Sequence, residues 1–304
     1  MQLGFVTAIL PDQSFEDVLR FAAQEGYDCI EVMCWPPGKA DRKFAGVSHI
    51  NVVDFTQAKA DDVRGLCEQH GVGISALGYY PNPLSGDAEE AEIALGHLRK
   101  VIDAAPLLGL STVNTFIGAD HRQPLEANFA AFEKVWPDVI RHAEDRGVRI
   151  GIENCPMLFT ADEWPFGKNL ARSPAVWRRM FETIDSDSLG LNYDPSHMVL
   201  QMMDYIAPIY EFRERMFHVH AKDMRIERDK LDAQGVWELG YAWCTPKIPG
   251  LGDVDWNRFV SALTDIGYDG PVCVEVEDDS FSANLAQRQR SLRLSQRILR
   301  PLVG

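Results

Sequence analysis

The sequence predicts a single (β/α)₈ barrel over residues 1–304, and three observations lead to this fold class. Short apolar, β-branched segments recur eight times along the chain, and amphipathic segments with helical spacing separate them. A glycine often stands between a helical segment and the next strand, as in Gln69-His70-Gly71-Val72, which fits a left-handed helix C-cap. This alternation is typical of parallel βαβ units, and eight of them fit one barrel.

The elements can be placed by their hydrophobic periodicity. The predicted strands are residues 2–7, 29–33, 73–77, 112–116, 149–153, 189–194, 216–220 and 272–276. The predicted helices are residues 15–24, 56–69, 88–107, 125–145, 174–184, 256–264 and 281–299. An open doubly wound sheet is the structural alternative, but its first strand would usually lead into a glycine-rich turn, and Leu10-Pro11-Asp12-Gln13-Ser14 is not one.

Residues 222–255 form the longest predicted irregular stretch, which is rich in charged residues, tryptophan and proline. The stretch follows the seventh strand, so in a barrel it would lie on the face that carries active sites. We therefore expect a lid-like loop or a pocket wall there. No Pro/Gly/Ser-rich linker divides the chain, which favours one domain.

Composition excludes several classes of function. The net charge is −15 and no cluster of Lys and Arg offsets it, which argues against nucleic acid as a partner. The sequence shows no signal peptide and no apolar run long enough for a membrane span. Its six cysteines form no CxxC pair or compact disulfide framework, so we expect a reduced, cytoplasmic protein.

Four successive strands end near an ionisable residue, namely Glu153, Asp194, His220 and Glu275. In the last strand Val274 alternates with Glu275, so period-two geometry turns the apolar side chains towards the helices and the ionisable ones towards the barrel axis. Several buried ionisable groups need a compensating charge, which a divalent cation would supply. Three carboxylates and one imidazole suit Mn²⁺ or Mg²⁺ better than structural Zn²⁺.

Each of these residues also has an ordinary structural interpretation. Glu153 or Glu275 could be a buried carboxylate paired with a lysine or arginine. Asp194, which precedes Pro195, could close a turn or cap a helix. A single histidine such as His220 is more often a hydrogen-bonded interior residue than a ligand. The metal hypothesis therefore depends on the coincidence of all four residues at strand ends.

Five motifs carry a resemblance that covers the whole chain. They are Ile152-Glu153-Asn154, Asp194-Pro195-Ser196-His197, His218-Val219-His220-Ala221-Lys222-Asp223, Pro249-Gly250-Leu251-Gly252-Asp253-Val254-Asp255-Trp256, and Gly267-Tyr268-Asp269-Gly270-Pro271 leading to Glu275. With these motifs the sequence resembles the xylose-isomerase-like barrels, the sugar phosphate isomerase/epimerase superfamily that includes ketose 3-epimerases, inosose dehydratases and endonuclease IV.

The resemblance implies roles for individual residues. Glu153, Asp194, His220 and Glu275 would hold one divalent metal ion, with Mn²⁺ expected first and Mg²⁺, Co²⁺ or Zn²⁺ as alternatives. Glu153 and Glu275 would form the acid/base pair, and His197 would contact a substrate oxygen. The early strands lack the additional His and Cys ligands of a trinuclear zinc nuclease, which argues against DNA repair.

Further pocket candidates follow from their position after predicted strands. Trp35 and Tyr79 could stack on a sugar ring, while Asn82 and Asn114 could bind hydroxyl groups. Lys222 could bind a phosphate or a substrate carbonyl. The alternatives are that the two aromatic residues pack a loop and that the lysine pairs with its neighbouring aspartate.

Three functional hypotheses remain open on the sequence. The first is a metal-dependent isomerase or epimerase that acts on a ketose or keto-sugar through proton abstraction and an enediolate. The second is a lyase on the same scaffold, which would dehydrate an inosose or cleave a 3-keto-glycoside by elimination. The third is a sugar-binding subunit without catalysis. The expected partner is a small-molecule sugar, and a homo-oligomer (dimer or tetramer) or a partner subunit is compatible with the sequence.

Overall fold

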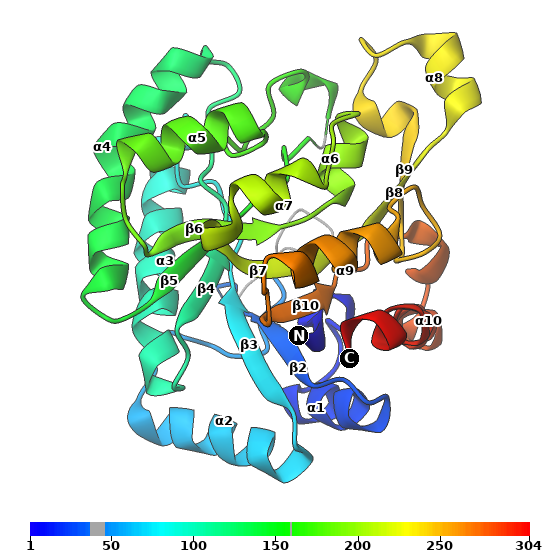
Figure 1. Ribbon diagram of the computed structural model, residues 1–304. Coiled ribbons are helices and arrows are strands. Elements are labelled where there is room, and N and C mark those ends of the chain that lie inside the picture. The colour runs from blue at the N-terminus through cyan, green and yellow to red at the C-terminus, as the bar shows by residue number, and fades with distance from the viewer. Residues whose placement is uncertain (37–45, 159) are drawn as a thin grey trace.

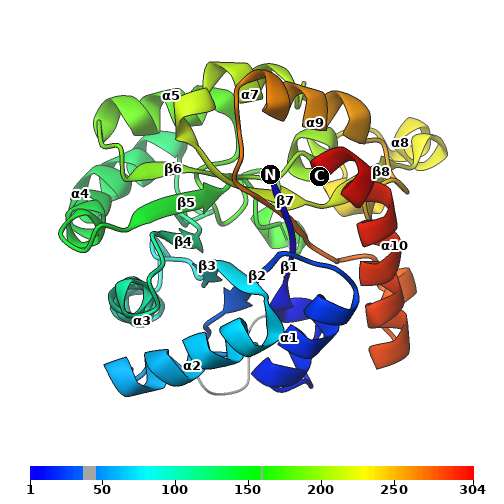
Figure 2. The same ribbon diagram turned by 60° about the horizontal axis from the view of Figure 1, so that its bottom comes forward.

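The computed structural model describes residues 1–36, 46–158 and 160–304. Eight parallel strands close into a barrel in the order β1-β10-β7-β6-β5-β4-β3-β2 (Figures 1 and 2). They are β1 (Gln2–Val6), β2 (Cys29–Met33), β3 (Gly73–Gly78), β4 (Thr112–Thr115), β5 (Arg149–Glu153), β6 (Leu189–Tyr193), β7 (Met216–Ala221) and β10 (Pro271–Val274). The predicted fold class is therefore confirmed.

Helices surround the barrel, as the view in Figure 2 shows. The long helices are α1 (Phe15–Gln24), α2 (Gln57–His70), α3 (Ala88–Leu107), α4 (Leu125–Glu144), α5 (Pro174–Thr183), α9 (Trp256–Asp265) and α10 (Leu285–Val303), with the shorter α6 (Ser196–Leu200) and α7 (Ala207–Glu211) between β6 and β7. Side-chain caps fix where several of them begin: Ser14 accepts a hydrogen bond from the backbone N–H of Asp17, and Asp255 accepts one from that of Arg258.

Two predicted segments differ from the observed elements by more than two residues at an end or in their content. The last helix begins at Leu285 instead of residue 281, because Asn284 caps it through the backbone N–H of Gln287 and a separate 3₁₀ turn precedes it. Residues 222–255 are not irregular: they contain β8 (Asp223–Ile226), α8 (Arg228–Gln234) and β9 (Cys244–Lys247), and the two strands pair antiparallel. This excursion, with β8, β9 and α8, projects away from the barrel (Figure 1).

One buried carboxylate holds the base of the excursion. Asp223 accepts hydrogen bonds from the backbone N–H groups of Met224, Gly250 and Val254 and from Nε1 of Trp256, at 2.9 to 3.0 Å. Its four donors come from both the outgoing and the returning chain. The carboxylate therefore joins the two ends of the excursion where they meet the barrel.

The core has an outer and an inner part. The outer part lies between strands and helices and includes the largest buried aromatic residues, such as Trp136 and Trp177. The inner part fills the barrel with side chains that include Cys29, Met33 and Cys273. All six cysteines are free thiols, and no helix among the described residues is both long and apolar enough to cross a bilayer.

Candidate metal centre

The carboxyl ends of four strands bring a compact group of ligand-type side chains together. Glu153 is the last residue of β5, Asp194 follows β6, His220 lies in β7 and Glu275 follows β10. One ligand atom from each of the four lies within 4.8 Å of the others. Glu153 is 2 % exposed, Asp194 and His220 are fully buried, and the Glu275 side chain is 19 % exposed. The structure thus gathers the four residues that the sequence singled out.

The atoms that face the centre of this group are short of partners. Among the described residues, Glu153 Oε1, Asp194 Oδ2 and His220 Nδ1 are buried and accept or donate no hydrogen bond. A buried polar atom without a partner costs about 1–3 kcal/mol, so three at one point need a further group. Carboxylate oxygens and an imidazole nitrogen are donors that divalent cations take. The residues present therefore fit a divalent metal ion.

Lys222 supplies positive charge to the same group. Its Nζ lies 2.6 Å from Glu275 Oε2, 3.1 Å from Asp194 Oδ2, 3.2 Å from Glu277 Oε2 and 3.8 Å from Glu153 Oε1. Burial opposes the charge, but Asp194 and Glu275 raise the pKa of the ammonium well above its ordinary value. One ammonium faces four carboxylates, so the cluster stays rich in negative charge.

His197 lies in the cluster, where the sequence placed a substrate contact. Its Nε2 is 3.3 Å from both Glu153 Oε1 and Asp194 Oδ2, and the side chain is fully buried. The imidazole also shares a possible ligand group with Glu153 and Cys155. A substrate oxygen that enters this group would meet the ring next to the carboxylates.

Glu153 and Glu275 are held in their ionised form. Burial works against the charge of Glu153, but the neighbouring imidazoles of His197 and His220 hold its pKa well below the usual range. Burial likewise opposes the charge of Glu275, while Lys222 lowers its pKa. Both carboxylates are consequently ready to accept a proton or to bind a cation.

Two asparagines hold the backbone that carries the ligands. The side-chain amide of Asn154 donates to the carbonyl oxygen of Asp194 at 2.9 Å and accepts from its N–H at 2.8 Å. Asn169 donates to the carbonyl oxygens of Glu153 and Cys155 at 2.9 and 2.7 Å. The hydrogen bonds of Asn169 could not be predicted, because Asn169 lies in a long connection between β5 and α5.

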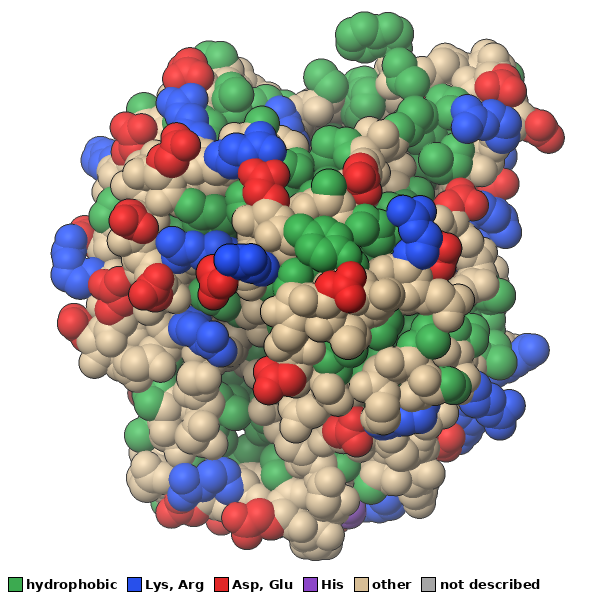
Figure 3. All heavy atoms as spheres, in the orientation of Figure 1, with side chains coloured by type: hydrophobic (Ala, Val, Ile, Leu, Met, Phe, Trp, Pro, Cys, Tyr) green, Lys and Arg blue, Asp and Glu red, His purple; other side chains and the backbone are tan. Residues whose placement is uncertain are grey.

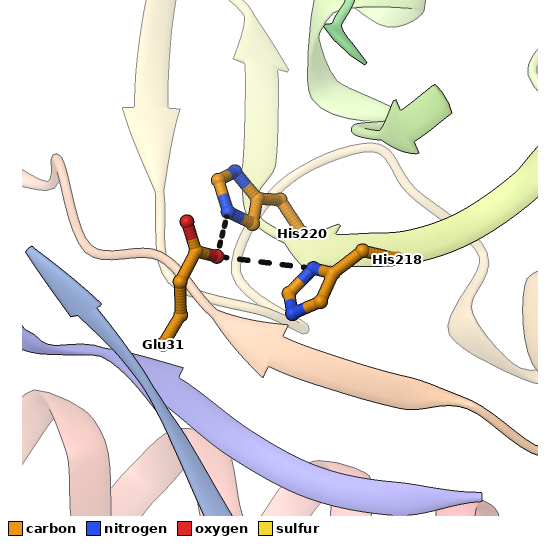
Figure 4. Close-up of side chains that lie close together, drawn as sticks. All are labelled: Glu31, His218 and His220. Atoms are coloured by element: carbon orange, nitrogen blue, oxygen red, sulfur yellow. Dashed lines mark hydrogen bonds and ion pairs between the residues drawn. The ribbon is translucent and has the colours of Figure 1, made fainter. Parts of the chain in front are cut away.

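The sequence analysis missed Glu31, which lies within β2 and is fully buried. Its Oε2 is 2.7 Å from Nε2 of His220 and 3.8 Å from Nδ1 of His218 (Figure 4). Tyr80, which follows β3, donates its hydroxyl hydrogen to the same carboxylate. An acidic residue between apolar neighbours in Cys29-Ile30-Glu31-Val32-Met33 was the available signal, since period two turns it into the barrel.

Tyr79 lies in the outer hydrophobic core, whereas Trp35 packs against both the outer and the inner part of the core, so its sugar contact stays a prediction. The Tyr79 ring packs edge-on against Trp35 at 4.9 Å and against His97 at 4.7 Å, in the outer hydrophobic core. Because consecutive residues of an extended chain face opposite sides, Tyr80 and not Tyr79 points into the barrel.

The two predicted asparagines differ in their surroundings. Asn82 is committed to the backbone of Ala119, to which it donates at 3.0 Å and from which it accepts at 2.9 Å, so it supports a loop. Asn114 is fully buried in the barrel, and neither polar atom of its amide has a hydrogen-bond partner among the described residues. Gly151 leaves room for it, because a Cβ there would lie 2.4 Å from Asn114 Oδ1.

A mostly apolar cavity of about 270 Å³ lies between the connection that follows β5, the end of α6 and the excursion. Leu158, Trp164, Leu200, Gln201, Val236 and Trp243 are among its lining residues. Gln201 donates a hydrogen bond to the carbonyl oxygen of His197 at 2.9 Å, so one lining residue is tied to the backbone of a residue of the cluster. The excursion supplies one wall through Val236 and Trp243. Another depression, of about 540 Å³, lies near the amino ends of β6 and β7, where Arg178 and Glu211 pair with each other.

The visible surface gives no sign of a polyanion site. On the face drawn in Figure 3, Lys and Arg side chains are interspersed with Asp and Glu and do not gather in one patch. This distribution agrees with the net charge of −15.

Comparisons with known proteins agree with this architecture. The family model described as "Xylose isomerase-like TIM barrel" matches residues 19–302. The uncharacterized protein YfiH of Bacillus subtilis (strain 168) is 27 % identical over 98 % of this chain and 99 % of its own length. An inosose dehydratase of Clostridium perfringens is 31 % identical over 113 residues, which span 35 % of this chain and 36 % of the relative.

Two solved structures share the fold. The IOLI protein with a bound zinc atom superposes with a TM-score of 0.73 at 18 % identity and covers 100 % of this chain and 98 % of that one. D-psicose 3-epimerase in the presence of D-fructose superposes with a TM-score of 0.72 at 17 % identity over 100 % of both chains. Together with a family match over most of its length, these findings show that the chain belongs to the xylose isomerase-like TIM barrel family.

Proposed function

We propose that this protein is a divalent-metal-dependent enzyme that isomerises or epimerises a ketose or keto-sugar. The observation that carries the proposal is the convergence of Glu153, Asp194, His220 and Glu275 at one point, with three of their facing atoms lacking hydrogen-bond partners among the described residues. The family supports an enzyme that acts on a small sugar, since the similar proteins include a ketose epimerase and an inosose dehydratase.

The four clustered residues would hold the ion, and their oxygen-rich set favours Mn²⁺ or Mg²⁺, with Co²⁺ and Zn²⁺ as alternatives. When bound, a divalent cation supplies positive charge that stabilises the negative charge developing on a substrate oxygen. His197 Nε2 and Lys222 Nζ lie within the same group, so they are placed to orient a carbonyl and an adjacent hydroxyl.

Proton transfer falls to the two glutamates. Glu153 comes from β5 and Glu275 from the end of β10, and β6 and β7 separate the two strands in the barrel. The carboxylates therefore reach the centre from two directions. One of them accepts the proton from the carbon next to the carbonyl, which leaves an enediolate. The other takes up a proton from water and delivers it to the opposite face, which inverts that carbon.

A lyase on the same scaffold is the second candidate, and the apolar cavity favours it. An enediolate that carries a leaving group on the next carbon expels that group, so the same proton abstraction leads to dehydration or to cleavage of a glycosidic bond. The cavity of about 270 Å³, which Leu200 and Gln201 help to line, would accept the apolar aglycone of a 3-keto-glycoside. A small ketose would leave this space without a function.

Proton exchange tests the proposal. The wild-type protein with MnCl₂ in D₂O should exchange a carbon-bound hydrogen of a ketose or a 3-keto-glycoside. Glu153→Gln and Glu275→Gln should lose at least ~10²-fold of this rate, the usual scale for a lost acid/base group. Glu163→Gln is a matched control, because Glu163 is also buried but pairs with Lys168 at 2.8 Å.

Each result has a definite meaning. Exchange with an inverted product supports the epimerase, whereas release of water or of an aglycone supports the lyase. A wild-type protein that binds sugars without exchange would instead be a sugar-binding subunit. Full activity in both glutamine variants would refute the assignment of the acid/base pair.

A further inference from the structure

His220 uses its two ring nitrogens on opposite sides. Nδ1 lies 3.6 Å from Glu153 Oε1 and 3.5 Å from Glu275 Oε2, so it faces the candidate metal position. Nε2 faces away from that position and lies 2.7 Å from Glu31 Oε2. A histidine can bind a metal through Nδ1 only when its proton is on Nε2 and the ring is turned the right way.

Glu31 is suited to fix both the proton and the ring. The carboxylate is fully buried, its Oε1 accepts the hydroxyl hydrogen of Tyr80, and its Oε2 lies 2.7 Å from Nε2 of His220. A carboxylate oxygen accepts hydrogen bonds, so the short contact places the ring proton of His220 on Nε2, which donates to Glu31. This leaves the lone pair of Nδ1 directed at the cluster.

The carboxylate is itself held in place from several sides. Tyr80 donates its hydroxyl hydrogen to Glu31 Oε1, and the Tyr80 oxygen lies 3.0 Å from the amide of Asn192. Asn192 Oδ1 lies 2.9 Å from Nδ1 of His218, which turns the amide nitrogen towards the Tyr80 hydroxyl. Because Nε2 of His220 donates to Glu31, the 2.9 Å approach of Asn192 Nδ2 to Nε2 is a packing contact and not a hydrogen bond. These buried contacts hold the Glu31 side chain in a single conformation inside the barrel.

The same residues could be taken for a second metal site, since Glu31, His218 and His220 can approach one point. The contacts of His218 argue against that interpretation. Its Nε2 lies 3.1 Å from Ser75 Oγ and its Nδ1 lies 2.9 Å from Asn192 Oδ1, so both ring nitrogens already have hydrogen-bond partners. By contrast, Nδ1 of His220 has none among the described residues.

We propose that Glu31 is a positioning residue that holds His220 for the metal, by accepting the Nε2–H hydrogen bond from across the barrel. This inference rests on the proposed metal site. In the barrel order, β10 and β1 stand between β7 and β2, so the contact joins two strands that do not pair. The partner of a ligating histidine usually contributes about 10–100-fold to metal affinity.

Titration calorimetry with MnCl₂ on the purified full chain tests the inference. Wild type should bind one Mn²⁺ per chain, and Glu31→Gln should bind it about 10–100-fold more weakly. Glu31→Ala should be weaker still, because an amide oxygen can accept the hydrogen bond of Nε2 whereas a methyl group cannot. Glu163→Gln serves as the buried-carboxylate control and should match wild type.

A spectroscopic readout separates positioning from mere folding. In ¹⁵N-histidine-labelled, Zn²⁺-loaded wild type, His220 should show a protonated Nε2 and a metal-bound Nδ1. In Glu31→Ala this single tautomer should be lost, even if the variant keeps the unfolding temperature of the metal-free wild type.

The outcomes separate the two proposals. Equal Mn²⁺ affinity in wild type and Glu31→Gln would overturn the role of Glu31 and leave the metal site standing. A wild-type protein that binds no Mn²⁺ would overturn the metal site and this inference together. Two Mn²⁺ per chain, one of them lost in Glu31→Gln, would show that Glu31 is a ligand and not a positioning residue.

Discussion

Replacing Lys222 by methionine tests the electrostatic account of the centre. Methionine keeps an unbranched chain and removes the charge that lies 2.6 Å from Glu275, 3.1 Å from Asp194, 3.2 Å from Glu277 and 3.8 Å from Glu153. Removing one partner of a buried ion pair costs about 3–5 kcal/mol. Since the Glu277 side chain is 37 % exposed and water screens part of its charge, we expect the lower end of this range.

Urea unfolding in EDTA should therefore show that Lys222→Met lowers the free energy of unfolding by about 3 kcal/mol. Added MnCl₂ should narrow this difference in the free energy of unfolding, because each tenfold lower Kd of the variant for Mn²⁺ adds about 1.4 kcal/mol to its stability at saturating metal. The charge-free variant should also bind Mn²⁺ more tightly than wild type does, since no ammonium competes for the carboxylates.

Lys230→Met provides the control, because Lys230 lies exposed on α8 and its loss should change stability by no more than about 0.5 kcal/mol. The reasoning fails if Lys222→Met is as stable as wild type in EDTA, since the carboxylates would then need no counter-charge. It also fails if saturating Mn²⁺ leaves the gap unchanged.

Three further predictions concern the barrel and its excursion. Gly4→Ala should lower the melting temperature, because a Cβ there would lie 2.7 Å from two cysteine sulfurs, and overpacking costs about 1–3 kcal/mol. An unchanged melting temperature would show that the side chains inside the barrel can shift without cost. In calorimetric scans Asp223→Ala should destabilise the fold more than Asp223→Asn, since the alanine leaves four N–H donors without an acceptor. Equal destabilisation by the two variants would contradict the role of the carboxylate. Burial lowers the pKa of His218 from 6.5 to about 4. Between these pH values the unfolded chain binds more protons than the folded one, so the free energy of unfolding should fall by about 3 kcal/mol as the pH drops through that window. His218→Asn should flatten this part of a urea-unfolding pH profile, and an unchanged profile would assign the acid sensitivity to other groups.

Much of the fold and of the centre can be predicted because both depend on local periodicity. The strands around Glu153 and Glu31 were placed with both ends correct, at residues 149–153 and 29–33. The alternation of apolar and ionisable residues shows which side chains face the barrel axis, and a closed barrel brings the strand ends together. The four clustered residues could therefore be named from sequence, whereas their role as ligands remains a prediction.

The missed residues depend on geometry that spacing does not contain. Glu31 lies behind the candidate metal centre, and its partner His220 is 189 residues away on a strand that does not pair with β2. Tyr79 and Tyr80 are adjacent in sequence, and a shift of one residue in the chain after β3 decides which of them enters the barrel. The sequence predicts an irregular excursion because its short strands, β8 and β9, pair only with each other.

The four hydrogen bonds to Asp223 close the excursion at its root, where the outgoing and returning chains meet. Whatever residues lie further out, the ends of this segment stay at a fixed spacing next to Lys222. The tip can accordingly lengthen, shorten or change composition with little disturbance to the carboxylates below. A family built on this arrangement can vary the substrates that it admits by changing the excursion, while the carboxylates that carry the chemistry stay in place.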